Sequence, residues 1–413
     1  MKTPFNLDRT HTATFAERLL RGAFPDKTFQ TLPIEAFADL AYSDELALKN
    51  ATLQAFWKLN RLDGTPEPIV PSPLPRHYRT STKRRVLVSR KGVTLSFIGG
   101  NAAQKSDAKH HESVLEPESH KKIYAFLSEK LNVPAYSTLA RHLNFVIVRG
   151  SYREPSVIFN VDMMNGEIVR KLKLLSEQLK GLPESVVSAY IFQDATRSSY
   201  TFEQKRPEVQ VPFKRLYGAE RLFLKILDKK FSYHPTAFSQ VNESLLPAML
   251  QTAEAMLAPH GSRLLDLYCG YGLFGLFLSE HYSEVIGLDA EGVSIQSARE
   301  NAPYFKASNK ASKVMFLSKR ITADALKRSL PPPSENEVVI LDPPRQGTEQ
   351  GTIQQIAMRK PVRVLHIFCG VDEIPKELKA WNQSGYRAER VLPLDMFAGT
   401  PNLETMVLLE PKS

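Results

Sequence analysis

A succession of short apolar segments, separated by stretches with helical patterning, constrains the fold of this 413-residue chain more than any other feature. Short buried strands that alternate with helices are typical of a parallel sheet covered by helices on both faces. The strands predicted in this way are residues 263–267, 284–289, 338–342, 362–368 and 405–409. From residue 214 onward we therefore expect an α/β domain built on a doubly wound, mostly parallel sheet.

The residues before 214 follow different patterns. Residues 1–70 are predicted to be mostly helical, because Ser43–Leu59 combines a serine cap, acids in the first turn and an apolar stripe. Five prolines between Pro66 and Pro75 then mark a linker. In residues 71–213 the predicted elements are strands 86–88, 94–98, 144–148, 156–161 and 188–192 and a helix 168–179. We expect a helical N-terminal segment (1–70), a smaller α+β central domain (71–213) and the sheet domain (214–413).

Composition excludes several classes of protein. No window approaches 18 consecutive apolar residues and the first residues lack the apolar run of a secretory signal, which predicts a cytoplasmic protein without a membrane partner. The only two cysteines, Cys269 and Cys369, are too few for a disulfide framework or for a four-thiolate metal or iron–sulfur site. We expect no metal centre and a monomer.

Positive charge is concentrated in one stretch of a chain whose net charge is +10. Residues 71–110 hold nine basic residues against one acid, Asp107. The basic residues are Arg76, Arg79, Lys83, Arg84, Arg85, Arg90, Lys91, Lys105 and Lys109. Such a run is either the solvated face of a strand or a surface that neutralises nucleic-acid phosphates.

A glycine-containing loop follows the first strand of the predicted sheet. In such sheets ligands bind beyond the carboxyl ends of the strands, where the segment Asp266–Gly272 lies. With Gly275 it completes a G-x-G-x-x-G pattern, which is weak by itself and leaves NAD binding open. Asp289, at the end of the next strand, is suited to accept ribose hydroxyls, or is simply a solvent-exposed acid.

The segment Asp342-Pro343-Pro344-Arg345 ends a later strand. Two prolines in a row fix the backbone and withhold two donors, so the acid and the carbonyls project rigidly into the cleft. An acid and two prolines in this position resemble S-adenosylmethionine-dependent methyltransferases that act on planar nitrogen or base substrates, and favour them over NAD enzymes.

Five motifs occur together in one order: Phe238–Asn242 (FSQVN), Leu267–Gly272 (LYCGYG), Asp342–Gly347 (DPPRQG), Phe368–Val371 (FCGV) and Thr400–Glu404 (TPNLE). This set resembles the RNA uracil carbon-5 methyltransferase family, in the form without an iron–sulfur cluster, from about residue 40 to the end. Pro71–Pro73 and His77–Arg79 are also similar to that family's central domain. The resemblance implies a Rossmann-like class I methyltransferase domain that uses S-adenosylmethionine to make 5-methyluridine in tRNA or rRNA.

The chemistry of uracil explains why this family needs a thiol and a base. Carbon 5 becomes nucleophilic only after a thiolate adds to carbon 6, and a base must then remove the carbon-5 proton so that the thiol leaves. By resemblance Cys369 is the nucleophile, Glu404 is the base and Cys269 only packs. The implied cofactor contacts are Gln240, Tyr268, Gly270, Asp289 and Asp342. The predicted RNA contacts are Arg76, Tyr78, Arg79, Lys83, Arg84, Arg85 and Arg345.

The chain departs from the family pattern around its nucleophile. Phe368 precedes Cys369 where the family has serine, and Gly370-Val371 follows it where the family has Asn-Pro. Leu273 also replaces a usual asparagine, and Asp289 a common glutamate. These changes keep open a catalytically silent RNA-binding or chaperone protein of the same fold. A methyltransferase for cytosine or another substrate is a third reading.

Overall fold

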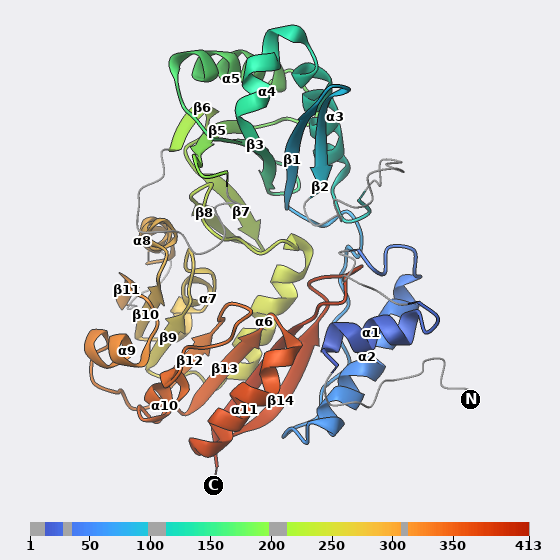
Figure 1. The fold of residues 1–413 in the computed structure, drawn as a ribbon. Helices are drawn as coiled ribbons and strands as arrows, with labels where there is room; N and C mark the ends of the chain where they lie inside the picture. Colours follow the sequence, from blue (N-terminus) through green and yellow to red (C-terminus); the bar gives the residue numbers. More distant parts are fainter. Residues whose placement is uncertain (1–12, 28–34, 98–112, 198–212, 307–312, 413) are drawn as a thin grey trace. The chain divides into compact units, whose positions relative to one another are not determined.

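The structure is a computed structural model that describes residues 13–27, 35–97, 113–197, 213–306 and 313–412. The chain forms two compact units: a sheet unit made of Met1–Pro75 and Ser244–Ser413, and a central unit made of Arg76–Glu243. Figure 1 shows the helices and strands of both units.

The sheet unit is built on seven strands in the order β11-β10-β9-β12-β13-β15-β14. The strands are β9 (Arg263–Leu267), β10 (Glu284–Asp289), β11 (Lys313–Ser318), β12 (Glu337–Leu341), β13 (Arg363–Phe368), β14 (Tyr386–Leu394) and β15 (Glu404–Pro411). The first five strands in this order run parallel, and β15 lies antiparallel between β13 and β14. This confirms the predicted doubly wound, mostly parallel sheet.

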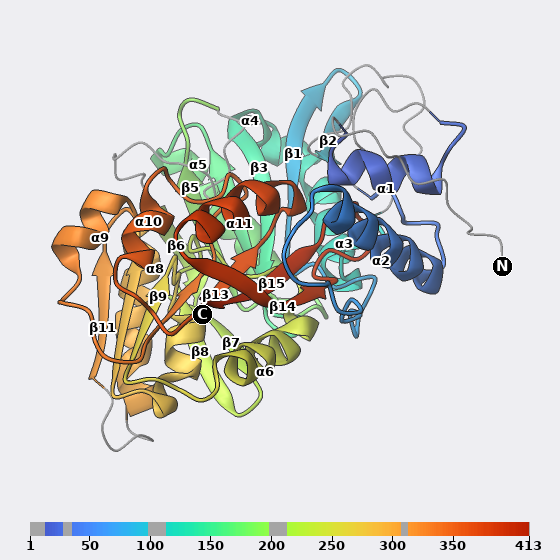
Figure 2. The same cartoon turned by 90° about the horizontal axis from the view of Figure 1, so that it is seen from below.

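Helices cover both faces of this sheet. They are α1 (Phe15–Ala23), α2 (Tyr42–Leu59), α6 (Leu246–Leu257), α7 (Leu273–Phe277), α8 (Gly292–Lys306), α9 (Ala323–Ser329), α10 (Thr352–Ala357) and α11 (Ile374–Gln383). Figure 2 shows α6 and α11 on opposite faces. The inner strands are buried on both sides, which explains why they appear in the sequence as continuous apolar runs.

The N-terminal helices belong to the sheet unit rather than to a segment of their own. Phe15 of α1 and Trp57 of α2 share one hydrophobic core with Val391 of β14 and Trp381 of α11. The chain after α2 also runs along β14, where the N–H of Val70 donates to the carbonyl of Pro393 at 2.9 Å. The structure therefore differs from the predicted division at residue 70, because the apolar stripe of α2 is buried against the sheet.

The central unit contains a six-stranded sheet in the order β2-β1-β3-β4-β5-β6 and a β7–β8 hairpin. Its strands are β1 (Ser81–Ser89), β2 (Gly92–Phe97), β3 (Leu143–Gly150), β4 (Pro155–Val161), β5 (Ser188–Gln193), β6 (Phe213–Gly218), β7 (Leu222–Ile226) and β8 (Lys229–Tyr233). Its helices are α3 (Glu118–Leu131), α4 (Ser137–His142) and α5 (Gly166–Leu179). The predicted α+β fold and the hairpin at Gly92 are confirmed.

The central unit extends further along the chain than predicted. It ends at Glu243 rather than at residue 213, because β6 pairs with β5 and the hairpin that follows stays with this unit.

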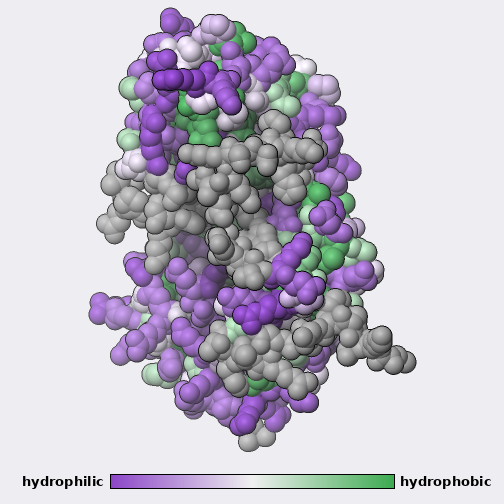
Figure 3. All heavy atoms as spheres, turned by 45° about the vertical axis from the view of Figure 1, so that its right-hand side comes forward, coloured by the Kyte–Doolittle hydropathy of each residue, from purple (hydrophilic) through white to green (hydrophobic). Residues whose placement is uncertain are grey.

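On the face drawn in Figure 3 the described side chains are mostly hydrophilic and the hydrophobic ones lie in small groups. No helix among the described residues is both long and apolar enough to cross a lipid bilayer.

Candidate active site

Acidic side chains from four strands meet at the carboxyl edge of the sheet unit. Asp266 is the next-to-last residue of β9, Asp289 ends β10 and Asp342 follows β12. Glu404 begins β15, and since this strand is antiparallel its first residue lies at the same edge. Residues that are far apart in sequence are thereby brought to one place.

The glycine loop after β9 is held by the acid of the neighbouring strand. The N–H of Gly270 donates to Oδ2 of Asp289 at 2.9 Å, and the N–H of Glu291 donates to Oδ1 at 2.7 Å. Tyr268 and Gly270 both have positive φ, 64° and 54°. A Cβ added at Gly270 would meet no atom within 4 Å, so a ligand can approach the backbone there.

Clustering of carboxyl groups perturbs their titration. Burial, the nearby Asp342 and the nearby Asp289 raise the pKa of Asp266 to about 7, against the hydrogen bond that its Oδ2 accepts from the N–H of Gly275 at 2.7 Å. Burial and Asp289 likewise raise the pKa of Asp342 to about 7. Carboxylates that repel one another in a desolvated site are stabilised by a bound cation.

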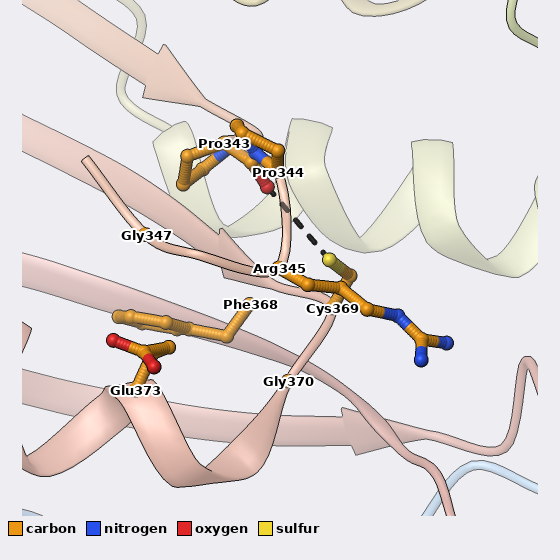
Figure 4. A pocket seen from close by; sticks show the side chains of 8 residues that line it. All are labelled: Pro343, Pro344, Arg345, Gly347, Phe368, Cys369, Gly370 and Glu373. Carbon is orange, nitrogen blue, oxygen red and sulfur yellow. Dashed lines mark hydrogen bonds between the residues drawn. The ribbon is translucent and has the colours of Figure 1, made fainter. Parts of the chain in front are cut away.

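The thiol of Cys369 lies in a small, open hollow at this edge, which is lined also by Pro343, Pro344, Arg345, Phe368 and Glu373. Figure 4 shows the sulfur turned toward the two prolines, 3.8 Å from the carbonyl oxygen of Pro343. The ring of Phe368 stacks on His366, with ring centroids 3.8 Å apart. Phe368 occupies the position before Cys369 where the resembling family has serine.

Cys369 and Glu404 lie at the ends of neighbouring strands, and the charge of Glu404 affects the pKa of the Cys369 thiol. The strand register pairs Phe368 with Thr405, which sets the residues next to them side by side. Burial, Glu404 and Asp342 raise the pKa of the Cys369 thiol, while Arg345 opposes the rise.

The carboxyl group of Glu404 has unusual surroundings. The residue is 1% exposed, and neither carboxyl oxygen has a hydrogen-bond partner among the described residues. Burial and Asp342 raise its pKa well above the usual value, and Arg345 again opposes the rise. A carboxylate with a raised pKa binds a proton strongly, and no hydrogen bond occupies the oxygens of Glu404, so its ionised form is available to take a proton from a ligand beside it.

The second cysteine has different surroundings. Cys269 is 5% exposed, and a Cβ added at Gly287 of β10 would come within 3.0 Å of its sulfur. The sulfur therefore fills the space above a glycine, as expected of a packing residue.

Gln240 belongs to the central unit, so its predicted cofactor contact stays a prediction. Its backbone segment is firmly held: Thr80 donates through its N–H to the carbonyl of Val241 at 2.9 Å, and the buried Arg149 donates to Oγ of Ser239 at 2.9 Å. The segment that carries Gln240 is thus a fixed part of this unit.

Two of the predicted RNA contacts are wrong. Tyr78 is 0% exposed, so its ring offers no stacking surface. Arg84 points inward from β1, forms a buried ion pair with Glu116 and lies 3.1 Å from the centroid of Phe97. Arg84 was predicted from the run of basic residues, but alternate residues of a strand face opposite sides. Tyr78 precedes β1, and its prediction rested on its place in that run and on the resemblance of His77–Arg79.

The other predicted RNA contacts, on β1 and just before it, have solvent-accessible side chains and stay predictions. Lys83 is half-buried and Arg85 is exposed, and Arg76 and Arg79 are half-buried. In the sheet unit Arg345 is exposed as well. Lys105 and Lys109 lie outside the described residues.

Sequence reasoning missed Glu373 in the thiol hollow and Phe397, whose ring centroid lies 5.6 Å from the guanidinium carbon of Arg345. Glu373 is four residues past Cys369, close enough to have been considered. Phe397 had no sequence signal, since its contact depends on the loop between β14 and β15.

Strand order, the acid-rich carboxyl edge and the thiol beside it define a Rossmann-like class I methyltransferase domain. Residues 206–412, half of the chain, match the family model described as tRNA (uracil-5-)-methyltransferase. The chain belongs to this family and is an RNA methyltransferase of the uracil-C5 type.

Curated relatives agree with this assignment. An uncharacterized RNA methyltransferase of Thermotoga maritima is 26% identical over 380 residues, which cover 90% of this chain and 81% of the relative. The 23S rRNA (uracil(1939)-C(5))-methyltransferase of a Marinomonas species is 32% identical over 186 residues, 45% of this chain and 41% of the relative. Among solved structures, the tRNA (uracil-54, C5)-methyltransferase of Pyrococcus abyssi, in complex with S-adenosyl-L-homocysteine, has the same fold. Its TM-score is 0.65 at 19% identity, over 93% of this chain and 88% of that one.

Proposed function

We propose that this protein transfers a methyl group from S-adenosylmethionine to carbon 5 of a uracil in tRNA or rRNA, with Cys369 as nucleophile and Glu404 as base. One observation carries the proposal. A thiol in a hollow and a buried carboxyl group without a hydrogen bond, 35 residues apart in sequence, lie side by side at the carboxyl edge of the sheet.

The acids at this edge fit S-adenosylmethionine by charge. Asp289 and Asp342, with the backbone at Tyr268 and Gly270, would hold it, because its sulfonium and ammonium groups are the cations that a repelling carboxylate cluster favours. When bound, it supplies the methyl group.

The protein residues carry out the remaining steps. The Cys369 thiolate forms a bond to carbon 6, and the electron pair of the 5,6 double bond makes carbon 5 nucleophilic toward the methyl group. Glu404 then takes the carbon-5 proton, the double bond forms again and the bond between Sγ and carbon 6 breaks. Burial raises the pKa of both the Cys369 thiol and the Glu404 carboxyl group, and Arg345 opposes both rises. A cation bound at the acidic edge would act in the same direction as Arg345, and would favour the thiolate and the carboxylate that these steps need.

RNA would be held by phosphate contacts from Arg76, Arg79, Lys83 and Arg85, with Arg345 near the reacting base. A base inside folded RNA must leave its stack to reach the thiol, as is general for base-modifying enzymes.

A mechanism-based adduct tests the proposal. RNA that contains 5-fluorouridine has no carbon-5 proton to remove, so the bond to Cys369 should persist and give a band on a denaturing gel when S-adenosylmethionine is present. Total tRNA and rRNA fragments form separate arms of the experiment. Cys369→Ala should abolish the adduct, and the matched variant Cys269→Ala should keep it. RNA binding without an adduct in either arm would instead favour the silent RNA-binding protein.

A further inference from the structure

A lysine of the N-terminal segment is completely buried next to the loop that precedes Glu404. Lys49 of α2 is 0% exposed. Its ammonium group donates to Oε1 of Glu45 at 2.7 Å, to Oδ1 of Asp395 at 2.7 Å and to the carbonyl of Phe397 at 3.4 Å. An ammonium group has three donors, so each donor has an acceptor.

This cluster grips the loop 395–403, which joins β14 to β15. Oε1 of Glu45 also accepts the N–H of Gly399 at 2.6 Å, and the N–H of Phe37 donates to the carbonyl of Gly399 at 3.1 Å. The N-terminal segment thus binds this loop at three of its residues. Glu45 and Lys49 are one helical turn apart, so α2 presents both from the same face.

The loop 395–403 contacts the strand position of Glu404 and the side chain of Arg345. Asp395 directly follows Leu394, which pairs with Glu404 across β14 and β15. Phe397 lies over the guanidinium group of Arg345, the cation that acts on both Cys369 and Glu404. A shift of the loop would therefore move the base and Arg345 together.

The energetics argue against a purely stabilising role for Lys49. Desolvating one ammonium and two carboxylate groups opposes the gain from pairing them, and apolar residues of the same size often stabilise a protein as well or better. What a buried charged cluster does specify is one arrangement of the groups around it, because every alternative leaves a charge unpaired.

We propose that Lys49 is a positioning residue that, through Asp395 and Phe397, fixes Glu404 and Arg345 for the reaction at Cys369. The inference rests on the proposed function, in which Glu404 removes the carbon-5 proton. Without the cluster of Lys49, Glu45 and Asp395, the bond to carbon 6 still forms, but removal of the carbon-5 proton slows. The methylated RNA then remains attached to Cys369. Displacement of a catalytic group by about 1 Å is enough to slow a step by about 100-fold.

The test neutralises the cluster without changing its size, in the variant Lys49→Met/Glu45→Gln/Asp395→Asn. A matched control, Arg359→Met/Glu337→Gln, neutralises another buried charged cluster of the sheet unit at the opposite edge of the sheet. There Arg359 donates to Glu337 at 2.6 and 2.7 Å, and Arg263 donates to Glu337 at 3.1 Å. Both variants are assayed as full-length protein for unfolding, for steady-state methylation of uridine-containing tRNA or rRNA, and for adducts on denaturing gels. The single variant Asp395→Asn keeps the Lys49–Glu45 pair and serves if the triple variant does not fold.

The triple variant should lower kcat about 10- to 100-fold with KM for RNA unchanged, and should accumulate a methylated adduct on ordinary uridine RNA. Asp395→Asn should show the same adduct to a smaller degree. The control variant should keep the wild-type kcat even where it loses as much stability as the triple variant. Equal losses of kcat in both variants, or no adduct in the Lys49 and Asp395 variants, would refute the positioning role alone. If the wild-type protein forms no adduct with 5-fluorouridine RNA, the proposed function fails, and this inference with it.

Discussion

Replacing Asp266 with asparagine should make the stability of the sheet unit less sensitive to pH. The side chain is 1% exposed, and burial together with Asp342 and Asp289 raises its pKa from 3.8 to about 7. In the unfolded chain the group titrates near its ordinary value. Between these two pKa values the folded state holds a proton that the unfolded state has lost, so the free energy of unfolding falls as pH rises through this window.

The shift of about three pKa units corresponds to about 4 kcal/mol once the pH is above 7, and to about 2–3 kcal/mol between pH 5 and pH 8. Asparagine keeps an oxygen that can accept the N–H of Gly275 but carries no titrating proton. The variant should therefore lose about 2–3 kcal/mol less than the wild type across this range, and should be relatively more stable at pH 8.

Urea unfolding at pH 5, 6, 7 and 8 measures this difference. The only two tryptophans, Trp57 and Trp381, are buried in the sheet unit, so their fluorescence follows this unit. Asp324→Asn, on the exposed side of α9, is the control and should parallel the wild type. Parallel curves for Asp266→Asn and the wild type would refute the argument that charge repulsion and burial hold the Asp266 proton.

Three further variants test the base and the RNA surface. Glu404→Gln should lower turnover on uridine RNA by about 100-fold or more and accumulate a methylated adduct, while the 5-fluorouridine adduct still forms; turnover near the wild-type rate would exclude Glu404 as the base. Arg85→Gln should weaken RNA binding and reduce the slope of log K against log salt by about one, measured by filter binding over a series of KCl concentrations. Arg84→Met should instead destabilise the protein by about 3 kcal/mol, because Glu116 loses its buried ion-pair partner, and a salt slope changed equally by both variants would contradict the assignment.

In the sheet unit, the strands that were not predicted are those at the edges of the sheet. β11 and β14 are the terminal strands in the sheet order and were not predicted. β14 carries charged residues such as Arg387 and Arg390 among its apolar ones, so it lacks the continuous run of a strand buried on both faces. The error on Arg84 of β1 has a different reason. Composition located the run of basic residues, but the side of the sheet that each residue faces depends on how β1 pairs with β2 and β3.

The inner strands of the sheet, and the acids, glycines, prolines and thiol at their ends, could be predicted from the sequence, because apolar periodicity and turn chemistry are local. Which of these groups meet depends on the tertiary structure. Glu404 lies beside Cys369 because β15 runs antiparallel between β13 and β14, and the pairing of strands depends on the whole sheet. Lys49 holds the loop before Glu404 from 346 residues away, a contact set by the burial of α2 against the sheet, which no sequence spacing records.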